Sequence, residues 1–296
     1  MNIPAEVREG VEALLGRIQV LTEVGGGCVH RAHRISTTSG SCFLKYGRAP
    51  GAGFFAAEAE GLWQLAEAGS GLRVPAVRAL CDADEGREFG WLALEWLEPG
   101  RRGHDFSRKL AEGLAALHAP VQGQWGWNRD GFIGTLPQRN DPVPDWATFW
   151  RTRRLEPQLE LARRLGRIPA EDRDWAQLLE RLPEALAAGE ADGASLLHGD
   201  LWGGNILATS SGDPAIVDPS AYRGHREVDL AMSELFGGFD VEFYRVYATL
   251  RPLHPGYAET RRGIYQLYYL LVHVNLFGDG YAARTAAVLQ SVLASL

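Results

Sequence analysis

Several features that would assign this chain to a common class of protein are scarce or missing from its sequence. Its 296 residues include 30 Lys or Arg against 37 Asp or Glu, a formal net charge of −7, so it lacks the basic excess that binds a nucleic-acid backbone. The N-terminus has no basic segment followed by an apolar one, and the most apolar stretch, 268–277, is interrupted by His273 and Asn275. We therefore expect no signal peptide, no membrane span and no nucleic-acid partner, but a cytoplasmic protein whose partner is a small molecule.

Cysteine is rare as well. Cys28, Cys42 and Cys81 are an odd number without the spacing of metal ligands, which suits a reducing compartment better than a disulfide scaffold or a zinc site. Cys28 directly follows three glycines, where backbone N–H groups would favour a reactive thiolate. We interpret Cys28 as a candidate redox-sensitive residue, with a buried strand position or a contact with Cys42 as an equally good alternative.

Lysine is almost absent. Of the 30 basic residues only Lys45 and Lys109 are lysines, and the others are arginines. A lysine kept in such a composition is expected where a compact ammonium is required and the wide, planar guanidinium of arginine does not fit. Lys45 is therefore a candidate functional residue.

The first hundred residues have the pattern of an antiparallel sheet with one helix. Short segments with β-branched or aromatic residues are separated by turns that contain glycine, at 17–24, 29–36 and 42–46. From 54 to 68 the apolar residues follow a helical period, and Glu58 lies on the apolar face of that helix. Residues 91–97 are again typical of a strand and lead into Glu98-Pro99-Gly100, a composition that fits a hinge.

The rest of the chain is mostly helical. Apolar residues recur at helical spacing near 106–117, 178–186 and 264–271. Short apolar runs flank polar and glycine residues, as small strands around a loop do, at 195–198, 206–208 and 215–217. The sequence thus predicts a two-lobed α+β fold, with a sheet and one helix in residues 1–97 and a mainly helical lobe in residues 98–296.

The loop between the short strands carries the strongest chemical signal. It has the sequence HGDLWGGN at 198–205, and Asp218 follows thirteen residues after Asn205. Phosphoryl transfer requires a carboxylate that orients the attacking hydroxyl, and oxygen ligands that hold Mg²⁺ on the phosphates. Asp200, Asn205 and Asp218 have the spacing of a kinase catalytic loop and its metal-binding aspartate. A polar turn would explain the polarity of this segment but not the joint spacing.

A second set of residues suggests a nucleotide site. Gly25-Gly26-Gly27 lies between two strands, where glycines let the backbone approach the phosphates of ATP. Lys45 on the third strand would pair with the α- and β-phosphates if a helix carboxylate held it, and Glu58 is placed to do so. Taken singly, the glycines are typical of a plain hairpin and Glu58 of a solvated helix, but their combination favours a phosphate site.

A third segment, YRGHREVDLA at 222–231, is expected to open a helix and to border the active site. Asp229 is placed to accept backbone N–H groups of the catalytic loop. His225, Arg226 and Glu227 are candidates for contact with a polyhydroxy substrate. Alternatively, an Arg-Glu pair at a helix start acts only through the helix dipole and surface pairing.

On these residues the chain resembles the fructosamine kinase, or ketosamine kinase, family, which is related to aminoglycoside phosphotransferases and choline kinases. The resemblance covers almost the whole chain and depends on 197–205, Asp218-Pro219, 224–232, 234–239 and Phe277-Gly278. Trp202, directly after the Asp-Leu pair, is more specific to this family than the general kinase pattern. Gly203 departs from the family pattern, because many members have a serine there.

The resemblance implies a protein-kinase-like fold and a role for each matched residue in the catalytic centre. Asp200 corresponds to the catalytic base. Asn205 and Asp218 correspond to the Mg²⁺ ligands, and Lys45 and Glu58 to the pair that grips the phosphates.

The resemblance also implies the ligands. Backbone groups of Glu95, Trp96 and Leu97 would bind adenine, and Trp202 would lie in the substrate site. The implied reaction uses ATP to phosphorylate the 3-hydroxyl of a fructosamine or ribulosamine, free or on a protein lysine, and its unstable product releases the amine.

Two alternatives remain open at this point. The first is a kinase of the same fold that acts on another small alcohol, such as an aminoglycoside, choline or homoserine, because fold alone does not determine substrate. The second is a pseudokinase that binds nucleotide as an interaction module, although the base, the metal ligands and the lysine are all present. The preferred sugar amine and the oligomeric state are not determined by the sequence.

Overall fold

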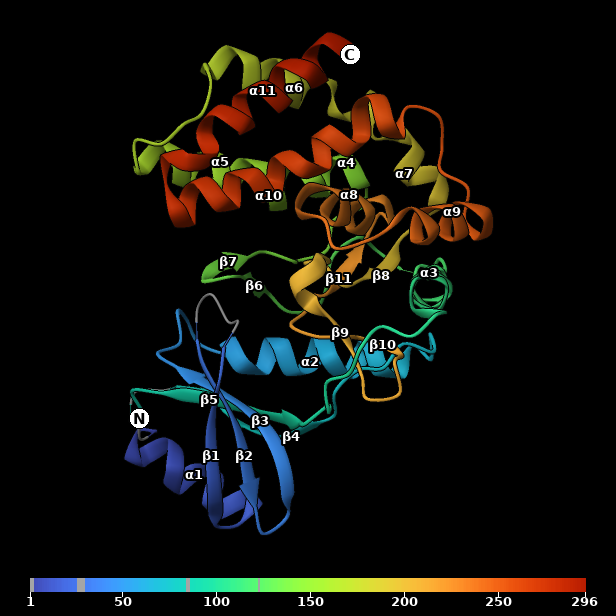
Figure 1. Cartoon of the computed structure of the whole chain (residues 1–296). Helices are drawn as coiled ribbons and strands as arrows, with labels where there is room; N and C mark the ends of the chain where they lie inside the picture. Colours follow the sequence, from blue (N-terminus) through green and yellow to red (C-terminus); the bar gives the residue numbers. More distant parts are fainter. Residues whose placement is uncertain (1–2, 26–29, 84–85, 122) are drawn as a thin grey trace.

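The computed structural model describes residues 3–25, 30–83, 86–121 and 123–296. Figure 1 shows a small lobe built around a five-stranded sheet, which holds the N-terminus, and a larger, mainly helical lobe, which holds the C-terminus. The predicted two-lobed α+β fold is confirmed. Within the described ranges, no helix is both long enough and apolar enough to cross a membrane.

The sheet of the small lobe is antiparallel, with the strand order β1-β2-β3-β5-β4. Its strands are β1 (Ile18–Val24), β2 (Arg31–Thr37), β3 (Gly40–Gly47), β4 (Val77–Cys81) and β5 (Gly90–Glu95). The register pairs Lys45 of β3 with Ala32 of β2 and Leu92 of β5, which places Lys45 on the central strand. Because side chains alternate between the two faces of a strand, Leu44 and Tyr46 point to one face and Lys45 to the other.

Two helices cover opposite faces of this sheet. α1 (Ala5–Leu15) packs on the face of Leu44 through Val7 and Val11, which are fully buried. α2 (Phe54–Glu67) lies between the sheet and the large lobe (Figure 1). The sequence predicted α2 but not α1, because α1 buries only these two valines and presents charged residues elsewhere.

The N-terminus of α2 is held by a residue remote in sequence. Gly53 precedes it with a φ of 73°, in the left-handed region that glycine adopts easily. The carboxylate of Asp82 accepts the N–H groups of Phe55 at 2.7 Å and Ala56 at 3.3 Å. These bonds satisfy N–H groups that have no partner within the helix, and they orient the helix that carries Glu58.

The large lobe consists mainly of helices. They are α3 (Phe106–Leu117), α4 (Trp146–Phe149), α5 (Glu156–Arg164), α6 (Asp172–Ala185), α7 (Ala187–Asp192), α8 (Glu227–Phe236), α9 (Val241–Leu250), α10 (Arg262–Phe277) and α11 (Ala282–Ser295). Three two-stranded sheets accompany them: β6 (Gly131–Ile133) with β7 (Leu136–Gln138), β8 (Ser195–Leu197) with β11 (Tyr222–Gly224), and β9 (Ile206–Ala208) with β10 (Pro214–Ile216).

The short strands expected near residues 195, 206 and 215 are confirmed as β8, β9 and β10. The segment after Asp218 differs from the prediction. Tyr222–Gly224 forms a strand that pairs with β8, and the helix begins only at Glu227. The pairing with β8 joins this segment to the chain directly before the catalytic loop.

The hydrophobic core continues across the junction of the lobes. One cluster of buried residues joins Phe55 of α2 and Leu92 of β5 to Leu114 of α3 and Ile216 of β10. A shared core holds residues of the two lobes at defined distances from one another. The sheet ends and the first helix of the large lobe begins on either side of residue 98, and the domain boundary at that residue stays a prediction.

Candidate active site

Three segments that are far apart in sequence meet at Lys45. Its ammonium contacts Oε2 of Glu58, on α2, and donates to Oδ1 of Asp218, which follows β10, at 2.6 Å. The side chains of Lys45 and Glu58 are only 11% and 9% exposed, whereas that of Asp218 is 59% exposed. The pairing of Lys45 with Glu58 expected from the sequence is present, and the Asp218 end of the group is open to solvent.

The charges of this group are strongly coupled. Burial disfavours a charged Lys45, but the carboxylates of Asp218 and Glu58 outweigh it and raise the pKa of the ammonium. Lys45 in turn lowers the pKa of Asp218. Burial raises the pKa of Glu58 to about 7 against the opposing effect of Lys45, and Oε1 of Glu58 has no hydrogen-bond partner in the described part of the chain.

The backbone of Asp218 is in a conformation that costs free energy. Its φ of 59° makes it the one non-glycine residue with a positive φ among the residues described. The left-handed region costs an L-residue about 1–2 kcal/mol. Hydrogen bonds on both sides maintain it: Val217 N–H donates to the backbone oxygen of Asn205, and Ser220 N–H to that of His198. Strain of this kind is typical of functional sites, where the surroundings hold a side chain in place.

Asp200 and Asn205 lie together at the catalytic loop. Nδ2 of Asn205 donates to the backbone oxygen of Asp200 at 2.8 Å and to its Oδ2 at 3.0 Å. Burial, followed by the charge of Asp218, raises the pKa of Asp200 to about 7, although the bond from Asn205 acts in the opposite direction. Asp200 is therefore a carboxylate that can accept a proton near neutral pH.

The loop that carries Asp200 is held by buried side chains. Asp229 of α8 accepts the N–H of His198 at 2.8 Å and that of Gly199 at 2.9 Å. This is the brace that the sequence predicted. Tyr269 of α10 donates its O–H to the backbone oxygen of Gly199 at 2.8 Å, a contact that no local sequence pattern indicated.

His198 connects the two halves of the site. It is fully buried, and burial lowers its pKa, so the ring is neutral and has one donor and one acceptor. Its Nδ1 accepts the N–H of Asp200, and its Nε2 then donates to the backbone oxygen of Val217 at 3.0 Å. The position of Asp200 is thus tied to Val217, the residue directly before Asp218.

Trp202 and two glycines shape the next part of the loop. The Trp202 ring is half-buried, lies edge-on to Phe236 and covers Gly204, where a Cβ would be 2.4 Å from the indole. A Cβ on Gly203 would lie 2.8 Å from Cα of Gly238. A serine, which the sequence resemblance leads one to expect at this position, would therefore require the two backbones to separate.

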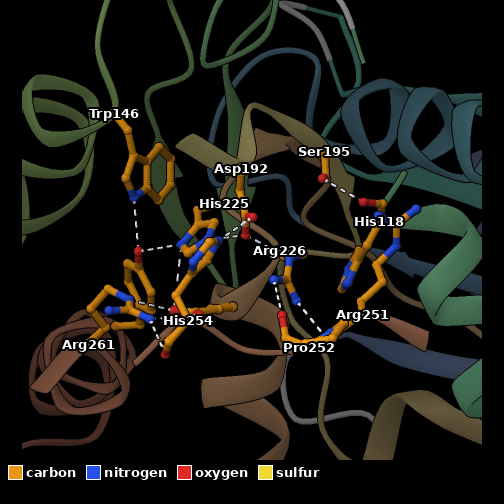
Figure 2. A network of polar contacts seen from close by, with 12 residues as sticks. His118, Trp146, Asp192, Ser195, His225, Arg226, Arg251, Pro252, His254 and Arg261 are labelled. Atoms are coloured by element: carbon orange, nitrogen blue, oxygen red, sulfur yellow. Dashed lines mark hydrogen bonds and ion pairs between the residues drawn. The ribbon is translucent and has the colours of Figure 1, made fainter. Parts of the chain in front are cut away.

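The structure corrects the interpretation of His225, Arg226 and Glu227. They are 0%, 5% and 0% exposed, and their polar atoms bind protein partners, as Figure 2 shows for His225 and Arg226. His225 and Arg226 donate to Asp192, and Glu227 binds both Nε and Nη2 of Arg261. These side chains are not available to a substrate, and the surface-pair alternative is wrong for the same reason.

The segment expected to bind adenine lies where β5 ends. Glu95, Trp96 and Leu97 line a cavity of about 880 Å³, and the Glu95 side chain pairs with Arg73 beside it. Lys45 is not among the residues that line this cavity. The contact of these backbone groups with adenine stays a prediction.

The glycine turn is only partly described. Gly25 is exposed at the end of β1, whereas Gly26, Gly27 and Cys28 lie outside the described residues, so the redox and phosphate-loop predictions stay as they were. Of the other two cysteines, Cys42 is buried and Cys81 is half-buried, and both are free thiols.

Comparisons with known proteins agree with this geometry. A family model described as fructosamine kinase matches residues 6–295. A probable ketoamine kinase of Synechocystis is 40% identical over 94% of this chain and 91% of its own length. A chloroplastic protein-ribulosamine 3-kinase of Oryza sativa is 36% identical over 95% of this chain and 80% of its own. The crystal structure of a putative fructosamine-3-kinase from Haemophilus somnus superimposes with a TM-score of 0.85 at 26% identity, covering 97% of this chain and 96% of the other.

The fold and the site thus define a kinase, a phosphotransferase that acts on a hydroxyl group and uses ATP. The chain belongs to the fructosamine kinase family.

Proposed function

We propose that this protein transfers the γ-phosphoryl group of ATP, in the presence of Mg²⁺, to the 3-hydroxyl of a ketosamine such as a fructosamine or ribulosamine, as a step in protein deglycation. The observation that carries the proposal is the placement of Lys45 between two carboxylates, close to a braced loop in which Asp200 and Asn205 are hydrogen-bonded. Family membership and the names of the relatives support the choice of substrate.

Lys45 would hold the phosphates of ATP. Bound between Glu58 and Asp218, its ammonium has the donors and the charge to contact the α- and β-phosphates. The ion pair with Glu58 would hold the ammonium in position. Glu95, Trp96 and Leu97 would then bind adenine through the backbone.

Mg²⁺ would be held by Asn205 and Asp218. Mg²⁺ binds oxygen ligands and is usually held by one or two side chains together with phosphate oxygens. The residues fit, because Asn205 uses its nitrogen for both bonds to Asp200 and so keeps its oxygen, and Asp218 uses Oδ1 for Lys45 and keeps Oδ2. A bound Mg²⁺ would neutralise charge on the transferred phosphoryl group.

Asp200 would act as the base. Its pKa of about 7 allows it to accept the proton of the sugar hydroxyl, and the Asn205 amide restricts its rotation. The half-buried Trp202, two residues further on, would contact the sugar.

ADP release with a panel of acceptors tests this proposal. Fructosyl-lysine and ribulosyl-lysine should be turned over, and choline, homoserine and kanamycin should not. Asp200→Asn is the matched control, because it should bind ATP and release no ADP with any acceptor. Turnover of kanamycin or choline alone would replace the proposed substrate with another alcohol, and nucleotide binding without turnover would favour the pseudokinase.

A further inference from the structure

One carboxylate of the large lobe gathers three donors from separate segments. Asp192, at the end of α7, accepts Nε of Arg226 at 2.7 Å, Nε2 of His225 at 2.9 Å and Nε2 of His254 at 2.7 Å (Figure 2). Burial alone would raise the pKa of Asp192, but the bonds from the two histidines and Arg226 outweigh it, and the pKa is well below its usual range. Asp192 is thus a charged group held by three partners.

The directions of the hydrogen bonds around Asp192 follow from the protonation of His225. Burial lowers the pKa of His225, so the ring is neutral and carries one N–H. Because Nε2 faces the Asp192 carboxylate, Nε2 carries the proton, and Nδ1 accepts the O–H of Tyr265 at 2.7 Å. The Tyr265 oxygen in turn accepts the indole N–H of Trp146 at 3.0 Å. Each donor in this half of the network has an acceptor.

The same argument applies to His118, which contacts Asp229 at the other end of the polar network. It follows α3, it is fully buried, and burial lowers its pKa. Its Nε2 donates to Oδ2 of Asp229 at 3.2 Å, so its Nδ1 accepts the O–H of Tyr247 at 2.8 Å. The backbone oxygen of His118 also accepts the hydroxyl of Ser195 at 2.8 Å, which fixes the residue to β8. The orientation of the Asp229 carboxylate is therefore set in part by His118.

Arg226 joins the two halves. Besides Asp192, its guanidinium donates to the backbone oxygens of Arg251 at 3.2 Å and Pro252 at 2.7 Å (Figure 2), and the N–H of Arg251 donates to the backbone oxygen of Tyr247 at 2.8 Å. A continuous polar path thus runs along Asp192, Arg226, the backbone of Arg251, Tyr247, His118 and Asp229 and ends at the backbone of the loop that carries Asp200.

We propose that Asp192 and Tyr247 are positioning residues for phosphoryl transfer, because they set the orientation of Asp229 and through it the place of Asp200. Asp229 holds the two residues directly before Asp200, so rotation of its carboxylate moves the base. A misplacement of about 1 Å can cost about 100-fold in rate. The inference rests on the proposed function in so far as Asp200 is the base.

Two variants interrupt the path at different points. Asp192→Asn keeps the shape but turns an N–H₂ group toward the donors around it, and Tyr247→Phe removes one hydroxyl and keeps the buried ring. Each should lower kcat by about 3- to 30-fold, with the KM for ATP and for the ketosamine changed less than about twofold. Because both substitutions act through one path, the fold-decrease in kcat of the double variant should be much smaller than the product of the two single fold-decreases.

Glu234→Gln is the matched control. Glu234 also lies on α8 and accepts from Tyr257 and Arg262, but it is not on the path to Asp229. The Glu234→Gln substitution should lower Tm and leave the kcat of the folded enzyme unchanged. If Asp192→Asn and Tyr247→Phe lower Tm with the same unchanged kcat, or if their effects on kcat multiply, the inference is wrong.

Amide hydrogen exchange gives a second measurement that requires no substrate. Exchange at His198 and Gly199 should accelerate in Asp192→Asn and Tyr247→Phe but not in Glu234→Gln, since only the first two release the carboxylate that holds these amides. Unchanged exchange in both path variants would overturn the inference even in an active enzyme. If the wild-type protein phosphorylates no ketosamine, the proposed function fails, and the exchange measurement still decides the inference.

Discussion

Two groups of charged residues in this protein are built on opposite principles. In the cleft cluster, which we define as Lys45, Glu58, Asp200 and Asp218, one ammonium contacts two carboxylates, and the charge of Asp218 acts on the third, Asp200. The pKa values of Glu58 and Asp200 are raised to about 7. In the buried network, defined as Asp192, His225, Arg226 and His254, a single carboxylate receives three donors.

The difference follows from what each group has to do. The cleft cluster carries excess negative charge and an unpartnered carboxylate oxygen, which a bound cation would offset, and it contains the strained backbone of Asp218, a feature typical of functional sites. The buried network is fully partnered before any ligand arrives, and a satisfied polar network in a low dielectric is rigid. The protein thus combines a cleft cluster whose polar groups lack some of their partners with a buried network whose polar groups all have partners.

The largest effect is expected from replacing Asp200, the proposed proton acceptor in the cleft cluster. Asp200→Asn keeps the shape and one acceptor oxygen but cannot take a proton, so kcat should fall by about 10² to 10⁴-fold while ATP binding is retained. ADP release and calorimetric titration with nucleotide measure the two properties. Retention of more than about a tenth of the wild-type turnover would assign the base to another residue.

The next largest effect concerns the ammonium. Lys45→Arg places a wide, planar guanidinium where the compact ammonium bridges Glu58 and Asp218. The kcat/KM for ATP should therefore fall by about 10- to 100-fold, the range expected for the loss of a hydrogen bond to a charged group. Arg8→Lys is the control for exchanging one cation for the other, because Arg8 pairs with Glu12 on α1, outside this site. Equal activity of the two variants would show that Lys45 has no special role.

A third prediction uses the same Asp200→Asn variant to test stability against pH. The pKa of Asp200 is raised from 3.8 to about 7 in the folded protein, so the folded state binds this proton more tightly than the unfolded state does. Its contribution therefore destabilises the wild-type protein as pH rises from about 4 to about 7, and the loss is complete above about 7. Ligand-free Asp200→Asn should be more stable than wild type at pH 8, by on the order of 4 kcal/mol, and about equally stable at pH 4.

Urea unfolding of the two proteins at both pH values measures this difference. A variant that is less stable than wild type at pH 8 would mean that Asp200 is stabilised by its surroundings, and the contrast with the buried network would disappear.

The smallest effect is expected at the edge of the buried network. His254 is 39% exposed and is one of three donors to Asp192, so His254→Gln should cost about 1 kcal/mol or less and leave kcat unchanged. Thermal unfolding and ADP release check both points. A large loss of turnover would indicate that the solvent-facing donor, and not Arg226, carries the coupling to the catalytic loop.

Much of the cleft cluster was accessible from local patterns. The spacing of Asp200, Asn205 and Asp218 belongs to one loop and one hairpin, so chain connectivity alone brings these residues close together. Lys45 and Glu58 were found because a strand and a helix of defined period place them on facing surfaces, and the rarity of lysine marked the first of them.

The errors concern residues whose surroundings come from elsewhere in the chain. His225, Arg226 and Glu227 resemble an exposed polar helix start, but Asp192 and Arg261 lie more than thirty positions away and bury all three. α1 was missed because its two buried valines are too few for a periodic signal.

The sequence by itself therefore determined the fold class, the place of the loop that carries Asp200 and the bracing Asp229, because each depends on period or spacing within a short segment. Only the tertiary structure decided which polar residues face a ligand and which are enclosed. A buried charge is tolerated only where partners satisfy it, and those partners, among them Asp192, His118 and Tyr247, are brought together by packing and not by proximity in the chain.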